Sequence, residues 1–277
     1  MLLLASFPLA ADGVGQFRFA QWNGPSLMIH AVEPEAAGPD APVVFVMHGV
    51  RRNAGEYRDN WIGLARKYAL RVYVPEFDAE RFPGAASYNL GGIESQGPRA
   101  FDAIEPLFKW LRDSRGSTAS GYVLFGHSAG AQFVHRFTCF ARPQHLQLAI
   151  AANAGWYTLP DHDQTWPYGL GSIDGSACKV DLWLQQPLMI LLGELDRDPR
   201  HRYLRRTPEA MQQGPNRLAR GHYFLRAGQA AAAALNVPLA WRLETVPGVG
   251  HDNSGMAKFA APKLRAWIRT RSAQLEQ

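Results

Sequence analysis

The stretch Tyr122-Val123-Leu124-Phe125-Gly126-His127-Ser128-Ala129-Gly130 decides the fold. Its first four residues form a short apolar run, typical of a strand that is buried on both faces, and a helical pattern follows over 131–137. A serine between two glycines at such a junction predicts a sharp, strained turn, because small neighbours let the strand and the helix pass closely. The sequence therefore predicts a nucleophile at Ser128.

Similar apolar runs recur along the chain and alternate with helical patterns. The runs cover 43–47, 70–74, 148–152, 188–192 and 240–246, and the helical patterns cover 57–68, 101–111 and 259–268. We expect Pro106 to kink or restart the second of these helices. Two earlier segments, 16–20 and 27–32, alternate in polarity and predict antiparallel strands. The whole pattern predicts an α/β fold, with a mostly parallel central sheet and helices on both faces.

Length and composition indicate one globular domain over residues 1–277. The chain is 47% hydrophobic and only 19% charged, which excludes intrinsic disorder, and 277 residues fit a single core. Residues 156–186 lack clear periodicity and lie between two expected strands. Because so long a loop in a compact domain is usually functional, we expect a short cap there.

Basic residues exceed acidic ones, 29 against 24, for a net charge of +5. Eight arginines gather after residue 196: Arg197, Arg200, Arg202, Arg205, Arg206, Arg217, Arg220 and Arg226. A solvated face over a helix is the preferred interpretation, and an anion clamp near the site is the alternative. The cluster lacks the interleaved aromatics and lysines of a nucleic-acid groove, so no nucleic-acid partner is expected. The oligomeric state stays open.

The two cysteines and the amino terminus bear on the compartment. Cys139 and Cys178 could pair once, but buried thiols are the preferred interpretation, since two cysteines make no disulfide scaffold or metal motif. Residues 1–11 contain an apolar run, but Pro8 breaks it and the first arginine is Arg18, which disfavours a signal peptide. We favour the cytoplasm over export, and no stretch approaches the ~20 apolar residues of a membrane span.

A serine hydroxyl needs a base, and an imidazole can take its proton near neutral pH. In folds with this turn, the order along the chain is serine, acid, histidine, and the histidine follows the last strand. His251 fits, because it ends the glycine-containing loop 247–250 after the expected strand 240–246. Three other histidines fit this position less well: His48, His127 and His222.

The acid should be a carboxylate at the end of a strand between Ser128 and His251. The strand at 188–192 is followed by Gly193-Glu194-Leu195-Asp196-Arg197-Asp198. We choose Asp196, since a turn opened by Gly193 brings it over the carboxyl edge of the sheet; Asp198 is second and Glu194 third. The acid fixes the tautomer of the imidazole and stabilises its charged form.

Negative charge that develops on a carbonyl oxygen needs two backbone donors. The amide of Ala129 is one, because it follows the nucleophile at the start of a helix. The other is expected from the loop after the strand at 43–47, where Gly49 allows a close turn and Val50 is preferred to Arg51.

These motifs together resemble the α/β-hydrolase superfamily. The resemblance rests on His48-Gly49, Gly126-His127-Ser128-Ala129-Gly130, Gly193-Glu194-Leu195-Asp196 and Gly250-His251, and it spans about Gln16 to Arg271. Within the superfamily the chain is similar to bacterial esterases grouped with polyhydroxybutyrate depolymerases and feruloyl esterases. It lacks the extra cysteines and additional domains of secreted depolymerases, which argues against a polymer substrate. The resemblance implies ester hydrolysis through a covalent intermediate.

Aromatic side chains gather in the expected cap. We predict that four of them form an apolar substrate pocket, although they could equally pin the cap to the body: Trp156, Tyr157, Trp166 and Tyr168. The triplet Asp161-His162-Asp163 is not expected to bind a metal, because three adjacent side chains rarely reach one ion. No metal or other cofactor is predicted.

The sequence thus predicts a serine esterase with a small-molecule or oligomeric ester as substrate. Three alternatives use the same residues: a peptidase or amidase, an acyltransferase, and, with less support, a polyester depolymerase. A silent binding protein of the same fold is the alternative outside enzymes, but the presence of Ser128, Asp196 and His251 argues against it.

Overall fold

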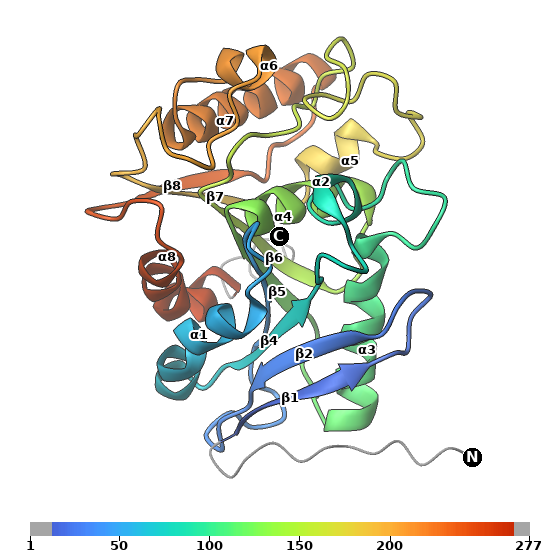
Figure 1. Cartoon of the computed structure of the whole chain (residues 1–277), viewed down its shortest axis with the longest axis vertical. Coiled ribbons are helices and arrows are strands. Elements are labelled where there is room, and N and C mark those ends of the chain that lie inside the picture. The colour runs from blue at the N-terminus through green and yellow to red at the C-terminus, as the bar shows by residue number, and fades with distance from the viewer. Residues whose placement is uncertain (1–12, 269–277) are drawn as a thin grey trace.

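The computed structural model describes residues 13–268, which build one eight-stranded sheet with helices on both faces (Figure 1). The strands are β1 (Val14–Phe19), β2 (Leu27–Val32), β3 (Val43–Met47), β4 (Arg71–Glu76), β5 (Tyr122–His127), β6 (Leu146–Ala152), β7 (Leu188–Gly193) and β8 (Arg242–Val246). They lie in the order β1-β2-β4-β3-β5-β6-β7-β8. Strand β2 is antiparallel to β1 and β4, and all other neighbours are parallel. The predicted fold class is confirmed.

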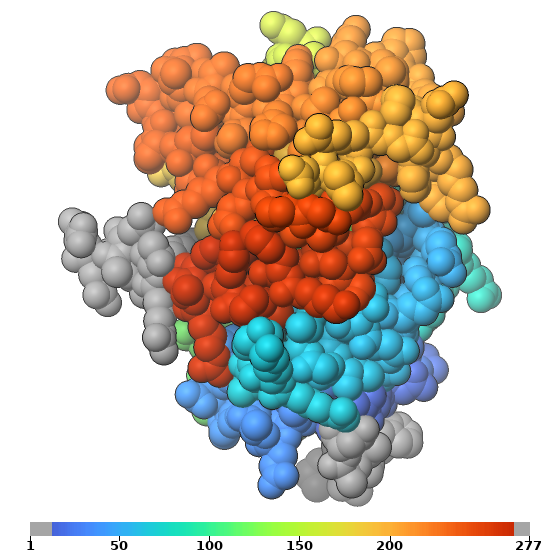
Figure 2. Space-filling view, turned by 90° about the vertical axis from the view of Figure 1, so that its left-hand side faces the viewer, coloured from blue at the N-terminus to red at the C-terminus, as the bar shows by residue number. Residues whose placement is uncertain are grey.

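The helices pack against the two faces of this sheet. They are α1 (Ala54–Tyr68), α2 (Gly84–Ser87), α3 (Ile104–Arg115), α4 (Ala129–Phe140), α5 (Val180–Leu184), α6 (Pro208–Gln212), α7 (Arg217–Leu235) and α8 (Asn253–Ala260), with short 3-10 turns η1 (Ala100–Ala103) and η2 (Ala261–Lys263). Helices α1 and α8 cover one face, while α3, α4 and α7 contribute to the core on the other. Figure 2 views the side on which α8, in red, lies against α1, in light blue to cyan.

Alternation along the central strands produces the two cores. On β3, Val44 packs with Trp61 of α1 on one side of the sheet, and its neighbour Phe45 packs with residues such as Phe108 of α3 on the other. Because successive side chains of a strand point to opposite faces, a strand covered on both sides must be apolar throughout. This explains why the central runs read as continuous apolar segments.

Proline 106 marks the beginning of a helix rather than a kink in its middle. Turn η1 precedes α3, and Pro106 lies in the first turn of α3. The amides of a first turn have no partner within the helix, so a proline there removes no hydrogen bond. The expectation of a restart is confirmed.

Residues 156–186, the expected cap, contain one short helix, α5, and an isolated bridge between Thr165 and Gly171. Much of the segment is tied to the body by buried aromatic side chains. Tyr157 stacks on Phe224 of α7, with ring centroids 4.4 Å apart. The segment therefore packs into the core that α3, α4 and α7 form on one face of the sheet.

The expectation of two free thiols is wrong: Cys139 and Cys178 form a disulfide. The bond joins α4 to the chain just before α5, with Cα atoms 5.2 Å apart. Both cysteines are buried, as expected, but their pairing depends on where the segment before α5 packs, which no spacing rule gives. The question of a signal peptide concerns residues 1–11, which lie outside the described residues. No helix among the described residues is long and apolar enough to cross a membrane.

Candidate active site

Ser128 lies in a strained turn between β5 and α4. Its backbone φ is 59°, a left-handed value that is uncommon for residues other than glycine. A Cβ atom added to Gly130 would lie 2.0 Å from the carbonyl oxygen of Met47, and one added to Gly126 would lie 2.3 Å from that of Gly130. Only glycines allow β3, β5 and α4 to approach this closely, which exposes the serine at the carboxyl edge of the sheet.

His251 connects Ser128 to Asp196. Its Nε2 lies 3.1 Å from the Ser128 Oγ, and its Nδ1 lies 2.7 Å from the Asp196 Oδ2. Since an ionised carboxylate only accepts, Nδ1 donates to Asp196 and Nε2 accepts from the serine hydroxyl. The structure therefore joins the three residues that the sequence predicted into one hydrogen-bonded chain.

The loops that carry Asp196 and His251 are bound to each other. The amide of Leu195 donates to the carbonyl of Val249 at 2.8 Å, and the amide of Gly248 donates to the Glu194 carboxylate at 3.0 Å. Asn153, at the end of β6, reaches both loops: it accepts from the Gly193 amide at 2.7 Å and donates to the Gly250 carbonyl at 3.0 Å. These bonds fix the distance between acid and base.

The other carboxylates in the acid loop have different partners. Asp198 is exposed, and its Oδ1 accepts from the amide of Arg200 at 2.8 Å. Glu194 binds the backbone of the loop before His251. Only Asp196 among the three candidates contacts the imidazole, at 3% relative exposure.

The second oxygen of Asp196 accepts from a buried arginine that the sequence did not single out for this place. The Arg217 Nη1 lies 3.2 Å from the Asp196 Oδ1, and Arg217 is only 1% exposed. Burial lowers the pKa of Arg217, and the Asp196 charge opposes that shift. Hydrogen bonds to both of its oxygens hold the Asp196 carboxylate in one orientation.

Two further imidazoles pack against His251. The ring centroid of His127 lies 4.6 Å away and that of His201 lies 5.1 Å away. Burial lowers the pKa of His127 well below 6.5, and burial together with Arg217 lowers that of His201. Neutral neighbours can contact an imidazole that gains a proton without repelling it strongly.

His48 is structural. Burial lowers its pKa to about 3. Its Nε2 accepts from the amide of Phe77 at 3.1 Å, and its Nδ1 lies 3.2 Å from the Gly49 carbonyl. The ring thus braces the start of the loop after β3, where a Cβ on Gly49 would lie 4.0 Å from the Ser128 Cβ.

Ser128 opens into a cleft of about 370 Å³. Val50 lines it and is 53% exposed, and Ala129 begins α4 directly beside it. Of the two residues with predicted oxyanion amides, Ala129 directly follows the nucleophile and Val50 lines the cleft into which Ser128 opens. The cleft is also lined by Gly49, Arg51, Asn53, Glu56, Tyr57, Asn60, His127, His201, Arg202, Tyr203, His251, Asp252 and Asn253.

The four aromatic residues predicted to form a substrate pocket do not line this cleft. Trp156 and Tyr168 pack on each other, centroids 4.6 Å apart, and Tyr157 lies in the core. Trp166 borders a separate hollow of about 250 Å³. All four rings are buried by packing against their neighbours. This arrangement agrees with the alternative interpretation, in which they hold the segment to the body.

The arginine cluster divides into two groups. Arg217 and Arg220 are fully buried, which corrects the preferred view of a solvated face for these two. Arg220 donates to the carbonyls of Gly155 and Arg205 at 2.5 and 2.9 Å. The others are exposed, and Arg202 lines the cleft together with Arg51. Positive charge therefore borders the site.

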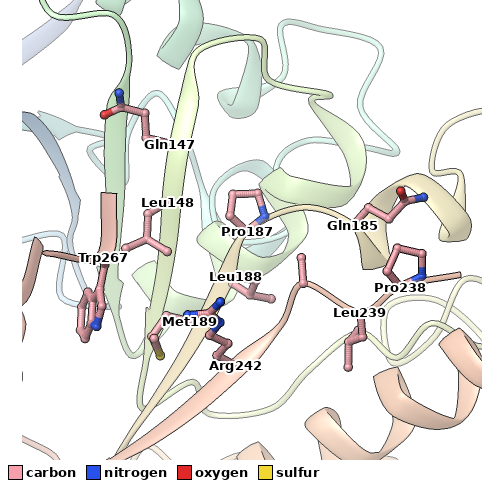
Figure 3. A pocket seen from close by; sticks show the side chains of 11 residues that line it. Gln147, Leu148, Gln185, Pro187, Leu188, Met189, Pro238, Leu239, Arg242 and Trp267 are labelled. Atoms are coloured by element: carbon pink, nitrogen blue, oxygen red, sulfur yellow. The ribbon is translucent and has the colours of Figure 1, made fainter. Parts of the chain in front are cut away.

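A second cavity, of about 430 Å³, lies away from these residues at the amino ends of the strands (Figure 3). Leu188 and Met189 at the start of β7, Arg242 at the start of β8 and Trp267 line it. The hydrogen-bonded chain around His251 lies at the carboxyl ends of β5, β7 and β8. The two hollows are therefore at opposite edges of the sheet.

Two solved structures resemble this chain along most of its length. Poly(aspartic acid) hydrolase-1 from Sphingomonas sp. KT-1 is 42% identical, with 91% of this chain and 98% of that chain covered and a TM-score of 0.85. The LpqC poly(3-hydroxybutyrate) depolymerase from Bordetella parapertussis is 34% identical, with 91% and 90% covered and a TM-score of 0.81. The chain belongs to this family of α/β-hydrolases. The predicted resemblance to polyhydroxybutyrate depolymerases is confirmed.

More distant structures share the fold of this α/β-hydrolase. S-formylglutathione hydrolase from Agrobacterium tumefaciens is 15% identical, with 94% of this chain and 96% of that chain covered and a TM-score of 0.59. Neither the family models nor the curated proteins that were searched contain a match to the chain.

Sequence reasoning missed His201, Tyr203 and Tyr57 in the lining of the cleft. His201 and Tyr203 come only a few residues after Asp196. A histidine and a tyrosine so close to the expected acid could have been predicted to line the site. Tyr57 comes from α1, whose apolar pattern hid its role, because a tyrosine on a buried helix face reads as core.

Proposed function

We propose that this chain is a serine hydrolase that cleaves carboxylic esters through an acyl-enzyme intermediate. The observation that carries the proposal is the hydrogen-bonded chain from the Ser128 Oγ through His251 to Asp196. An imidazole held between a serine hydroxyl and a buried carboxylate is the arrangement that activates serine for attack. The family, which includes a polyester depolymerase, agrees with this reaction.

In the first half of the reaction, the Ser128 Oγ attacks the carbonyl carbon of the ester while its proton passes to the Nε2 of His251. The carbonyl oxygen becomes an oxyanion, and the amides of Ala129 and Val50 donate to it. The tetrahedral intermediate then collapses: the bond between the carbonyl carbon and the alcohol oxygen breaks, and the alcohol leaves with the proton from His251.

In the second half, a water molecule gives a proton to His251 and attacks the acyl carbon. The bond to the Ser128 Oγ breaks, the serine recovers the proton, and the carboxylic acid leaves. Asp196 holds the Nδ1 proton of His251 throughout and stabilises the charged imidazole. Arg217 keeps the acid in place by occupying its other oxygen.

Hydrolysis of p-nitrophenyl butyrate at pH 8 tests the proposal. We expect turnover by the wild type and a loss of at least about 10³-fold in kcat for Ser128→Ala, because the nucleophile is gone. A matched variant, Ser172→Ala, removes an exposed serine that lies in the segment 156–186, and should keep wild-type turnover. A wild type without esterase activity, or a Ser128→Ala variant that retains it, would contradict the proposal.

A second candidate function is cleavage of amide bonds in an anionic chain. Two observations favour it: the 42% identity to a poly(aspartic acid) hydrolase, and the positions of Arg51 and Arg202 in the lining of the Ser128 cleft. Guanidinium groups at the mouth attract carboxylates, and this attraction weakens as salt increases.

Poly(aspartate), hydroxybutyrate oligomers and the p-nitrophenyl ester distinguish the two candidates. If anionic amides are substrates, kcat/KM for poly(aspartate) should fall steeply with ionic strength and fall again in Arg51→Gln and Arg202→Gln. If neutral esters are the substrates, poly(aspartate) should not be cleaved and the arginine variants should match the wild type on the oligomers.

The compartment is also a proposal. Disulfides persist mainly in oxidising compartments, so the bond between Cys139 and Cys178 supports export rather than the cytoplasm favoured from the sequence. Mass spectrometry of the protein isolated from its cells under alkylating conditions tests this. An intact disulfide is expected, and two alkylated thiols would contradict it.

A further inference from the structure

His201 lines the Ser128 cleft but does not belong to the hydrogen-bonded chain of Ser128, His251 and Asp196. It comes five residues after Asp196 and lines the same cleft as Ser128 and His251. Its ring meets that of His251 nearly edge-on, at an interplanar angle of 68° and a centroid distance of 5.1 Å. A histidine in this position is in reach of a bound substrate.

The contacts of His201 determine which ring nitrogen carries the proton. Its Nδ1 lies 3.2 Å from the Nη2 of Arg217 and 3.3 Å from the backbone nitrogen of Tyr203. A guanidinium and an amide can only donate, so Nδ1 must be the acceptor for both. A neutral imidazole with an unprotonated Nδ1 carries its hydrogen on Nε2.

The charges around His201 favour this neutral form. Partial burial, Arg217 and His251 lower its pKa, while Asp196 and Asp198 oppose the shift. Arg217 is itself held by Asp196, so one guanidinium binds the Asp196 carboxylate and orients the His201 ring. Protonation at Nδ1 would break two hydrogen bonds and place a cation against a guanidinium.

The position of His201 indicates which part of a substrate it meets. In the proposed reaction the Nε2 of His251 gives its proton to the departing alcohol, so the alcohol lies beside that imidazole. His201 packs against His251 and lines the same cleft as Ser128, and we take this position to adjoin the alcohol side. Within residues 13–268, the hydrogen bonds of the His201 ring are made by Nδ1, so the hydrogen on Nε2 is available to a ligand.

We propose that His201 determines specificity for the leaving alcohol, by donating its Nε2 hydrogen to an oxygen acceptor on that alcohol. Such an alcohol carries a carbonyl or carboxylate, as a hydroxy acid does; a relative of this chain acts on a polyester of a hydroxy acid, and the new element is the residue that binds the alcohol. The inference rests on the proposed esterase function and adds the residue that reads the alcohol. Arg217 serves it as a positioning residue.

Two butyrate esters test the proposal, those of pentan-1-ol and of methyl 3-hydroxypropanoate. The acyl groups are identical and the alcohols have equal chain length, but only the second alcohol carries a carbonyl. The measured quantity is the ratio of kcat/KM for release of the two intact alcohols, divided by the ratio of the rates at which hydroxide releases the same alcohols. This normalisation removes the difference in intrinsic reactivity.

We expect the wild type to prefer the carbonyl-bearing ester. His201→Leu should reduce the preference about tenfold, the effect of one lost hydrogen bond. His201→Gln, whose amide can donate, should restore part of it, which a merely structural role would not do. His222→Leu, at an exposed position on α7, is the matched control and should keep the wild-type ratio.

Several results would overturn the inference. The first is a wild type without the preference. The second is a His201→Leu variant whose kcat/KM falls equally for both esters or for neither. The third is a His201→Gln variant whose preference is no higher than that of His201→Leu. The wild-type ratio decides even if a variant fails to fold. A wild type that hydrolyses neither these esters nor p-nitrophenyl butyrate would remove the proposed function as well, so the two failures are distinguishable.

Discussion

Asp196 and Arg217 form an ion pair inside the protein, with 3.2 Å between Oδ1 and Nη1 and with both side chains at least 97% excluded from water. The pair links the acid loop to the first turn of α7. Taking two charges from water costs free energy, and their attraction and remaining hydrogen bonds offset it only when the geometry is good. The position of Asp196 in its hydrogen bond to His251 therefore depends on the ion pair with Arg217.

Removal of Arg217 should destabilise the protein strongly. Arg217→Met leaves the Asp196 carboxylate buried without its cation, a change that costs about 3–5 kcal/mol. Urea denaturation monitored by circular dichroism measures the free energy of unfolding. Arg226→Met, at an exposed position of the same helix, is the control and should change stability by less than about 0.5 kcal/mol. Equal stabilities of the two variants would contradict the importance of the pair.

Replacing each carboxylate with an amide should affect activity very differently at Asp196 and at Asp198. Asp196→Asn removes the acceptor that holds the His251 tautomer, so kcat for p-nitrophenyl butyrate should fall about 10⁴-fold. Asp198 is exposed and accepts only a backbone hydrogen bond from its own loop, which asparagine can also accept. Asp198→Asn should therefore stay within about twofold of the wild type. A larger loss for Asp198→Asn would reverse the assignment.

The close approach of β3 and α4 predicts opposite effects for two glycine substitutions. Gly130→Ala places a Cβ 2.0 Å from the Met47 carbonyl oxygen and should cost about 3 kcal/mol or more, with loss of activity. Gly63→Ala, at an exposed position inside α1 with no heavy atom within 4 Å of the added Cβ, should stabilise by about 1 kcal/mol. Thermal unfolding compares them, and a harmless Gly130→Ala would disprove the packing argument.

Acid should destabilise the protein partly through His48. Burial lowers the pKa of this residue to about 3 in the folded state, so between about pH 3 and 6.5 the unfolded state binds one more proton. The stabilisation is therefore complete above about pH 6.5 and declines as the pH falls toward 3, by about 1.4 kcal/mol per pH unit.

Urea denaturation at pH 7, 6 and 5 measures this slope. His48→Gln should flatten it by about one proton, because glutamine does not titrate. His222→Gln, at an exposed position, should keep the slope of the wild type. Identical slopes for all three proteins would show that His48 carries no such linkage.

Local sequence determined most of the fold. The runs that became β3, β5 and β7 are apolar on every position because both faces are covered, and Pro106 marked a helix start by chemistry that needs no tertiary information. The pairing of Cys139 with Cys178 was not predictable, since it depends on how a segment without periodicity returns to α4.

The candidate site divides in the same way. Ser128, Asp196 and His251 each follow a strand, and strand ends meet at one edge of a parallel sheet, so the sequence predicted that these residues lie together, as their hydrogen bonds show. Arg217 begins a helix 21 residues after Asp196, and its burial arises from packing of α7 on the sheet. Trp166 lies at a separate hollow and not in the Ser128 cleft, and the sequence could not distinguish these places because an aromatic side chain fits a core and a pocket equally well.

Labelling with a fluorophosphonate tests the central claim most directly, because this reagent modifies serines that a neighbouring base activates. Intact-protein mass spectrometry should show one adduct on the wild type, located to the peptide that contains Ser128, and none on Ser128→Ala. His251→Ala should label far more slowly. An unlabelled wild type, or equal labelling of Ser128→Ala, would contradict the account.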